Sequence, residues 1–508
     1  MVLAAAAALV ARPATAQCPE GTPPPCARAA PTVSAPDPQG VAVLYFADLS
    51  RDTAAAPIAD GLTEEIIARL SQVAGLRVPS RYATIRYRGR RVVDPRQVGR
   101  ELGMRYVLDG TLRRAGQRLR VVLAMTDATN GLNVWGHTYE RPLDDIFTIQ
   151  DSVAIHVAER VLGQLTAGDR GRLAPVAASA SVDAYEAYLR GVAAIRSRTA
   201  ASASVAVAQY RRAIALDPRF GRAWAGLAHA LALALGWGWS ITGVADDSIQ
   251  SLADQAAQQA LALDSSSSAA WLAASMAERA RDRRLSLALN QRAVALDSGG
   301  VEVLHQLSWE YLGLGDVDTA IAIERRVIAR DAYYAYAYAG LAHMLNAAGR
   351  PAEALAVATE GVAIDSTNAP LYWQLADAQL QLGDAAAARR AVDRAQVFGF
   401  DTLGVRILRA MASLVAGDTV VVRRELPDLD RAMEVDLRRA RGGIGYASAV
   451  LLSGLYGRLG DVDGSLRWAS RGAESLRRYY AVYFTRHWMW APVRDDPRFQ
   501  RFVAALRD

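Results

Sequence analysis

Histidine and lysine are two of the side chains that often take part in catalysis. In this chain the histidines are few and scattered, and lysine is absent. The six histidines form no His-x-x-x-His or His-x-His pair, so the sequence has no zinc-site spacing; they are His137, His156, His229, His305, His343 and His487. All 58 basic residues are arginines, and no lysine is present. A phosphate-binding loop, a kinase strand and a Schiff base each need an amine that arginine cannot replace. We therefore expect no enzymatic activity, no cofactor and no metal.

Arginine is concentrated in the segment from Arg77 to Arg120. This segment holds 13 arginines against three acidic residues, a balance of +10, whereas the whole chain has a net charge of +6. Such a segment could contact the phosphates of a nucleic acid, an anionic surface of the cell envelope, an acidic protein, or only water. The expected export of the chain, described below, argues against a nucleic acid, and a solvated face is the simplest interpretation.

Asp144, Asp145 and Asp151 form an acidic group that could bind a cation. The apolar residues around them recur at helical spacing, which places the acids on the opposite, solvated face near the start of a helix. Negative charge is favourable there, because the helix dipole is positive at its N-terminus. We therefore interpret this group as a solvated helix start rather than as a metal site.

The elements that would position binding residues follow a period of 34 residues. Four glycines recur at 34-residue steps, namely Gly315, Gly349, Gly383 and Gly417. Four aspartates at the ends of apolar runs recur at steps of 33, 34 and 34, namely Asp264, Asp297, Asp331 and Asp365. A pair of amphipathic helices cannot bury its apolar face alone, so this period predicts helical hairpins that stack into a solenoid with a concave binding surface.

Three of these units resemble the tetratricopeptide repeat. Counted from Val301, Ala335 and Ala369, they place a bulky residue at position 4, a leucine at position 7, a small residue at position 8 and an alanine at position 20. The pattern decays towards the C-terminus, where we expect degenerate or capping repeats. The resemblance implies an all-α solenoid of five to seven repeats over residues 180–475, followed by a helical cap over residues 476–508.

The same resemblance assigns a binding groove. In tetratricopeptide repeats, positions 2, 5, 9, 12 and 13 of the first helix line the concave face, where partners bind. The residues that map to these positions are Glu302, His305, Trp309, Tyr336, His343, Asn346, Trp373, Asp377 and Gln381. One or two aromatic anchors often dominate such binding, so we expect Trp309 and Trp373 to anchor a partner protein or peptide. The alternative is that these two indoles pack against adjacent repeats.

A loop from Gly236 to Gly243 is inserted between two units and contains Trp237 and Trp239. Two closely spaced tryptophans could form an exposed aromatic platform for a sugar or a peptide. They could equally pack under the first hairpin, and this second interpretation is the one that we favour.

The N-terminus predicts export. An apolar run over residues 2–11 is too short to span a bilayer, and small residues follow it. We expect a signal peptide over residues 1–16 and a Pro-rich linker over residues 17–38, in which Cys18 and Cys26 form a disulfide or remain free thiols. The chain is therefore expected in the periplasm or outside the cell; a translation start further upstream would instead allow a cytoplasmic or membrane-anchored protein.

Residues 39–165 have a mixed periodicity, which is typical of an α/β domain. Short apolar runs predict strands, and amphipathic runs predict helices. The expected elements are strands at 41–46, 76–78, 105–112, 118–127 and 132–140, and helices at 60–70, 95–103 and 143–165. Asn130-Gly131 predicts a hairpin between the last two strands. The order β-α-β-α-β-β-β-α indicates an α/β sandwich.

Four segments of this domain resemble a known module. Residues 41–50, 59–65, 101–110 and 143–151 are similar to the TolB-like module, itself FlgO-like, that precedes tetratricopeptide repeats in bacterial adenylate-cyclase-associated proteins. Residues 496–500 resemble the end of those chains. In relatives the module is commonly fused to a nucleotide-cyclase, winged-helix or protein-kinase domain. The resemblance implies an interaction or sensory module.

Two functions from different classes follow. We predict a non-catalytic scaffold of the cell envelope that binds a partner protein or peptide through the concave face of its repeats. The alternative is a sensory or regulatory module of a nucleotide-cyclase, protein-kinase or transcription-regulator system that lacks its effector domain.

Overall fold

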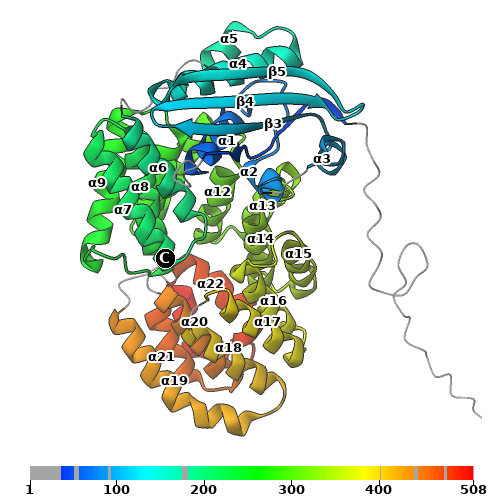
Figure 1. The fold of residues 1–508 in the computed structure, drawn as a ribbon. Coiled ribbons are helices and arrows are strands. Elements are labelled where there is room, and N and C mark those ends of the chain that lie inside the picture. The colour runs from blue at the N-terminus through cyan, green and yellow to red at the C-terminus, as the bar shows by residue number, and fades with distance from the viewer. Residues whose placement is uncertain are drawn as a thin grey trace, which may run out of the picture.

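The computed structural model describes residues 36–50, 56–89, 93–173, 181–400, 402–439, 444–473 and 477–506. The predicted signal peptide, most of the predicted linker and both cysteines lie outside these ranges. Within them, the chain forms an N-terminal domain that contains a sheet, followed by a helical solenoid (Figure 1). Among the described helices, none is both long and apolar enough to cross a bilayer.

The N-terminal domain is built on a five-stranded sheet. Its strands are β1 Asp37–Val43, β2 Ala47–Asp48, β3 Met104–Ala115, β4 Arg118–Asp127 and β5 Leu132–Pro142. Strands β1 and β2 pair with β3 in parallel, and β3, β4 and β5 form an antiparallel meander. Gly131, with a φ of 78°, lies in the predicted turn between β4 and β5. The meander is as predicted, and β1 begins two residues before the predicted domain boundary.

Helices pack on one face of this sheet, and on the other face near β1 and β3. They are α1 Ala56–Leu70, α2 Arg81–Thr84, η2 Ile85–Tyr87, α3 Pro95–Leu102, η3 Leu143–Asp145, α4 Ile146–Leu162 and α5 Ala167–Arg172. Val41 and Val43 of β1 share one core with α1 and α4, whereas Ala42 packs on the other side with α3 and η2. This alternation is the period of two that a strand imposes on its side chains.

The predicted strand at 76–78 is wrong. Arg77 forms a single parallel bridge with Gly40, and Pro79 follows with no N–H to continue a ladder. Ser80 instead caps the short helix α2 by accepting a hydrogen bond from the amide of Tyr82. The chain therefore turns towards the solenoid at this point, and the observed order is β1-β2-α1-α2-α3-β3-β4-β5-α4.

Eight helix pairs within the described residues form the solenoid, one more than the largest predicted number. The pairs are α6 Val182–Ile195 with α7 Ala200–Leu216, α8 Gly221–Trp237 with α9 Ile249–Leu263, α10 Ser268–Glu278 with α11 Arg283–Leu296, α12 Val301–Gly313 with α13 Val317–Arg330, α14 Ala335–Ala347 with α15 Pro351–Ile364, α16 Ala369–Gln381 with α17 Ala385–Val397, α18 Thr402–Val415 with α19 Thr419–Arg439, and α20 Ile444–Arg458 with α21 Val462–Gly472. A 3-10 turn, η4 Asp246–Ser248, lies in the inserted loop, and α22 Arg477–Arg486, η5 Trp488–Trp490 and α23 Pro497–Ala505 follow the last pair.

Glycine closes the turn inside each of the later pairs. The φ angles of these glycines are positive, from 73° to 91°, at Gly315, Gly349, Gly383, Gly417 and Gly460. Only glycine adopts this left-handed conformation without a steric penalty. In the first pair, α6 and α7, the equivalent position is held by Arg198 with a φ of 45°. This pair lies within the predicted solenoid, residues 180–475, although its turn lacks the glycine that marks the later pairs.

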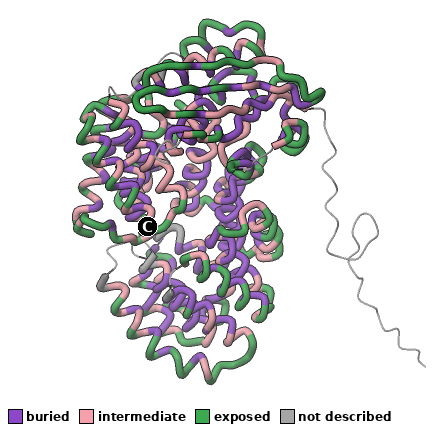
Figure 2. The backbone as a smooth tube through the Cα atoms, viewed as in Figure 1, coloured by how far each residue is buried: buried purple, intermediate pink, exposed green. Residues whose placement is uncertain are grey.

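The solenoid curls until distant pairs meet, and the N-terminal domain lies on top of it (Figure 1). The ring of Trp237, the last residue of α8, contacts Phe400, after α17, edge-on at 6.4 Å between centroids. Arg222 of α8 donates to Glu65 of α1 at 2.8 Å. In Figure 2, buried stretches of these helices alternate with intermediate and exposed ones. The predicted concave face therefore looks onto other parts of the same chain.

Candidate binding site

The nine predicted groove residues lie on α12, α14 and α16, the first helices of three consecutive pairs. They meet three different neighbours: the N-terminal domain, the segment formed by α22 and η5, and a pocket at the turns of the solenoid. The repeat pattern predicted the helices but not these neighbours.

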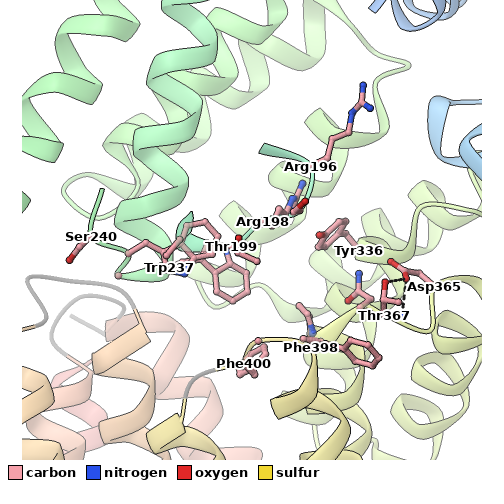
Figure 3. A pocket seen from close by; sticks show the side chains of 18 of the residues that line it. Arg196, Arg198, Thr199, Trp237, Ser240, Tyr336, Asp365, Thr367, Phe398 and Phe400 are labelled. Atoms are coloured by element: carbon pink, nitrogen blue, oxygen red, sulfur yellow. Dashed lines mark hydrogen bonds between the residues drawn. The ribbon is translucent and has the colours of Figure 1, made fainter. Parts of the chain in front are cut away.

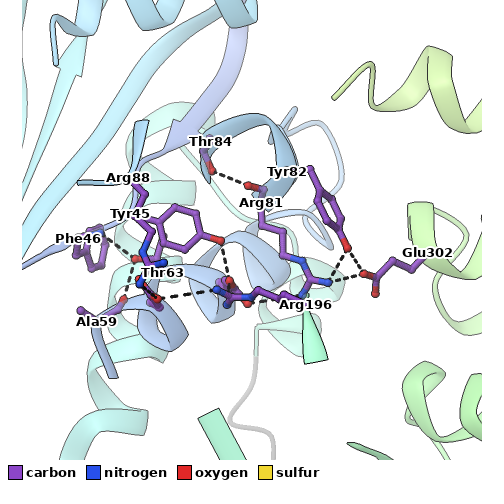
Figure 4. A network of polar contacts seen from close by, with 12 residues as sticks. Tyr45, Phe46, Ala59, Thr63, Arg81, Tyr82, Thr84, Arg88, Arg196 and Glu302 are labelled. Carbon is purple, nitrogen blue, oxygen red and sulfur yellow. Dashed lines mark hydrogen bonds and ion pairs between the residues drawn. The ribbon is translucent and has the colours of Figure 1, made fainter. Parts of the chain in front are cut away.

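Glu302 contacts the N-terminal domain. Its carboxylate accepts hydrogen bonds from Arg81 and from the hydroxyl of Tyr82, both on α2 (Figure 4). Burial alone would raise the pKa of Glu302, but Arg81 and Tyr82 outweigh it and lower the pKa to about 2. Ser80 of the same segment donates to Asp331 at the end of α13. Glu302 therefore helps to hold the two units together.

His305, Trp309 and His343 form an aromatic cluster that α22 covers. Nδ1 of His305 lies 2.7 Å from Oε1 of Glu324, and the indole N–H of Trp309 donates to Nε2 of His305 at 3.3 Å. Trp309 stacks on His343 at 5.2 Å, and His343 stacks on Tyr483 of α22 at 6.3 Å. Burial lowers the pKa of His343 to about 4. This part of the inner face is therefore occupied by the chain itself.

Asn346, Asp377 and Gln381 form a polar network with His487, which links α22 to η5. Oδ1 of Asp377 lies 3.2 Å from Nε2 of His487, and Nε2 of Gln381 lies 3.1 Å from the same nitrogen. Gln381 also donates to Oδ1 of Asn346 at 3.2 Å. The side chains of His487 and Asp377 are 0% and 5% exposed. These polar groups therefore satisfy one another inside the protein.

Tyr336 and Trp373 lie at the open edge of the inner face. The guanidinium carbon of Arg198 lies 3.8 Å from the ring centroid of Tyr336. Trp373 stacks on Phe400 at 4.5 Å. Both side chains are half-buried. Of the two predicted anchors, Trp309 thus packs on His343 and Trp373 packs on Phe400, and their role in binding a partner stays a prediction.

A pocket of about 980 Å³ opens beside Tyr336 (Figure 3). One wall is the turn between α6 and α7 together with the loop after α8, and the other wall is formed by residues 365–370 and 398–400. Trp237 and Trp239 stack on each other at 5.8 Å in the first wall. Both indoles pack against the core of the first pairs and also line the pocket. The two indoles therefore pack against the first helix pairs, as we favoured, and they also border a pocket, as an aromatic platform would.

A second, larger cavity lies between the N-terminal domain and the solenoid. Its volume is about 2300 Å³, and Arg198 and Tyr336 line it as well as the smaller pocket. His229 of α8 also lines it, and burial lowers the pKa of that imidazole to about 4. His229 is therefore neutral at physiological pH.

Most of the arginine segment is engaged within the chain. Seven of its arginines form ion pairs with carboxylates of this protein, namely Arg77, Arg81, Arg86, Arg88, Arg105, Arg114 and Arg120. Arg69, just before the segment, likewise pairs with Asp151 at 2.5 Å. In the part of the chain that the structure describes, no group of three or more His, Cys, Asp or Glu side chains is arranged to hold a metal ion. Binding of an anionic envelope surface stays a prediction.

Comparisons with known proteins agree with the repeat assignment. A family model described as tetratricopeptide repeat matches residues 345–410. A protein of Rhizobium meliloti (strain 1021) named "Putative adenylate cyclase 3" is 38% identical over 210 residues, which are 40% of this chain and 34% of the relative. This chain thus spans about a third of the length of that curated relative.

Solved structures of tetratricopeptide-repeat proteins are similar over part of the chain. A thermophilic protein of Thermus thermophilus is 18% identical with a TM-score of 0.33, covering 39% of this chain and 99% of its own. YrrB, described as a TPR protein with an unusual peptide-binding site, is 16% identical with a TM-score of 0.27, covering 41% of this chain and 97% of its own. On the evidence of the family model and of the stacked helix pairs, the chain contains tetratricopeptide repeats.

Proposed function

We propose that the chain is a non-catalytic scaffold whose repeats bind a segment of a partner protein. The observation that carries this proposal is the pocket of about 980 Å³, which half-buried aromatic side chains border: Trp237, Trp239, Tyr336, Phe398 and Phe400. Ligand sites are typically concave and roughly 300–1,000 Å³ in volume, and aromatic side chains are frequent anchors. The pocket therefore supports capture of a short segment rather than of a flat surface.

The predicted groove residues divide according to their neighbours. Tyr336 borders the pocket, and Trp373 supports its wall through Phe400. Glu302 is held by α2, and the other six contact one another or the segment of α22 and η5. The chain itself therefore covers much of this surface, although Glu302, Trp309, His343 and Gln381 remain half-buried and Glu302 also lines the larger cavity. The proposed site is the pocket, where the aromatic side chains border an open cavity.

A selection with phage-displayed random octapeptides tests the proposal. The full chain is immobilised, and enrichment is compared with that on Trp237→Ala and on Trp271→Ala. Trp271, on α10, is also half-buried and donates its indole N–H to the carbonyl of Ser265, but it lines neither cavity. We expect the parent and Trp271→Ala to enrich the same peptides and Trp237→Ala to lose them. Equal enrichment on all three proteins would place the binding site elsewhere, and no enrichment on any would contradict the proposal.

The regulatory alternative has its own support. The curated relative carries adenylate cyclase in its name, and the matched region is a minority of its length. In this alternative the chain would sense a signal and pass it to a cyclase, kinase or transcription regulator supplied by another polypeptide. Coexpression with such an effector, with cyclic AMP measured in the presence and absence of the chain, separates the two functions. A change in cyclic AMP that survives Trp237→Ala would favour the regulatory function.

We also propose that the N-terminal domain is a TolB-like module. The segments that resemble that module and the α/β architecture of the described residues between 36 and 173 support this assignment. The chain works in the cell envelope, which the apolar N-terminal residues 2–11 support. Fractionation of cells that express the full chain with a C-terminal tag tests the location. Recovery in the cytoplasm with an unprocessed N-terminus would contradict it.

A further inference from the structure

Arg198 occupies a position that the repeat reserves for glycine. Within the described residues it is the non-glycine residue with a positive φ, 45°, and it stands where five later pairs have glycine immediately before the start of the second helix. An L-residue in the left-handed region is strained, and such strain persists where the surroundings or a function require the side chain. The geometry of the turn therefore does not explain why arginine stands at this position instead of glycine.

The guanidinium of Arg198 lies over the ring of Tyr336, at the junction of the pocket and the larger cavity. It forms no hydrogen bond or ion pair with any residue that the structure describes. A guanidinium has five N–H donors and no acceptor. Tyrosine hydroxyls and the Glu302 carboxylate around it keep its pKa raised against the effect of burial, so it remains charged. Arg198 thus presents unused donors to a cavity.

The nearby acceptors are already engaged. Glu302 accepts from Arg81 and Tyr82, and Asp365 accepts from the backbone and hydroxyl of Thr367 at 3.0 and 2.7 Å. The buried hydroxyl of Tyr334, two residues before Tyr336 and among the groups that raise the pKa of Arg198, also has no hydrogen-bond partner among the described residues, although Tyr334 lines neither cavity. The guanidinium of Arg198 therefore faces the cavity without an acceptor from the described chain.

Aromatic side chains continue from this point along the pocket. Trp237 and Trp239 stack on each other, and Trp237 meets Phe400 edge-on (Figure 3). Beyond them, Ser240 donates to Asp246 at 3.1 Å, which places a carboxylate at the far end of the lining. Arg198 thus lies at one end of the pocket, aromatic side chains lie in its middle and Asp246 lies at the other end, and Asp247, Asp365 and Asp436 also line it. A run of acidic residues would be repelled by these carboxylates.

We propose that Arg198 binds one acidic side chain of the partner segment, and that the aromatic middle of the pocket receives an aromatic or large apolar residue beside it. This inference rests on the proposed function, because it names the chemistry of the segment that the scaffold captures. Charge-assisted hydrogen bonds to a guanidinium are stronger than neutral ones and are often bidentate. The strained turn is the structural consequence of placing that guanidinium at the pocket.

The octapeptide selection, extended to two variants, tests this inference. Arg198→Gly removes the guanidinium and relaxes the turn, and Arg198→Gln keeps a polar side chain of similar reach without the charge. We expect peptides from the parent to contain one Asp or Glu beside an aromatic residue. On both variants, we expect the aromatic preference to persist and the acidic residue to fall to its frequency in the starting library.

The outcomes separate the inference from the proposed function. Enriched peptides without an acidic residue, or an acidic preference that survives Arg198→Gly in a folded protein, would overturn the inference and leave the scaffold function intact. No enrichment on the parent would overturn both. As a quantitative check, changing the acid of an enriched peptide to its amide is expected to weaken binding to the parent about tenfold, and to leave binding to Arg198→Gly nearly unchanged.

Discussion

The inner face of α12, α14 and α16 and the pocket beside it are built from the same helix pairs, yet the chain treats them differently. Along the inner face, polar and aromatic side chains meet α2 or the segment of α22 and η5, and His487 with Asp377 is almost completely enclosed. At the pocket, aromatic rings and Arg198 are only half-buried and face a cavity. The contrast teaches that repeat positions define an inner face, whereas the remainder of the chain decides which part of it is open.

The largest expected effect comes from breaking the enclosed contact between Asp377 and His487 on the inner face. Asp377→Ala would leave His487 without its carboxylate partner inside the protein, and removing one partner of a buried polar pair typically destabilises by about 3 kcal/mol. Asp393→Ala is the matched control, because Asp393 pairs with Arg409 on the exposed surface and should change stability by less than about 0.5 kcal/mol. Urea unfolding followed by circular dichroism measures both. Equal losses in the free energy of unfolding for the two variants would show that the contact between Asp377 and His487 does not stabilise the packing of the segment of α22 and η5.

The next effect sharpens the comparison between two turns. Gly383→Arg places an arginine in the turn between α16 and α17, at the position that Arg198 occupies in the first pair. The φ of Gly383 is 84°, and the space around its Cβ position is open. We expect a loss of about 1 to 2 kcal/mol from backbone strain alone. Arg198→Gly is the reciprocal change and should leave stability unchanged or raise it, because relief of strain offsets the lost contact with Tyr336. A clear loss of stability in Arg198→Gly would mean that the arginine is kept for packing.

A smaller effect depends on pH at the contact between the two units. The folded-state pKa of Glu302 is lowered from 4.5 to about 2, so its carboxylate stabilises the docked state above pH 4.5 and this contribution is lost as the pH falls towards 2. Glu302→Gln should therefore be less stable than the parent at pH 7, and the difference should shrink between pH 4.5 and 2. Urea midpoints of both proteins across this range provide the measurement. A stability difference between the two proteins that does not change with pH would show that the charge of Glu302 does not stabilise the contact between the two units.

The smallest expected effect concerns the imidazole of His343, whose pKa burial lowers to about 4. Tyr483→Ala removes the ring that stacks on His343 from α22 and should admit water, so the pKa should rise towards the ordinary value of about 6.5. Proton NMR titration of the imidazole follows this change. Tyr480→Ala, on the same helix and buried, is the control, and an equal rise in both variants would indicate general loosening of α22 rather than loss of the stacked ring.

The local elements were predictable from the sequence because their signals are local. The turn glycines from Gly315 to Gly417, the three strands of the meander and the Asn130-Gly131 hairpin each follow from neighbouring residues, and the structure confirms them. The predicted strand at 76–78 is wrong for a local reason too, because Pro79 has no N–H with which to continue a ladder beyond the bridge at Arg77. The first helix pair lies inside the predicted solenoid, but its turn carries Arg198 in place of the glycine that marks the later turns.

The covering of the inner face was not predictable in the same way. Contacts such as Glu302 with Arg81 or Asp377 with His487 join segments that are far apart in sequence, and no periodicity links them. One signal was available: the segment from Tyr480 to Trp490 is dense in aromatic residues, which indicates that it must pack against something. The repeat pattern, however, specifies nothing about which surface such a segment covers.

The contact between Trp237 and Phe400 has a kinetic consequence. Neighbouring helix pairs can form early because their residues are close in sequence, whereas this contact must wait until the intervening pairs have stacked. We expect it to be among the last contacts to form and the first to break, so that hydrogen exchange near residues 237–239 and 398–400 is faster than in α14. A segment held between the two walls would then leave no faster than those walls separate, and its residence time would be set by the opening of the protein rather than by the strength of its own contacts.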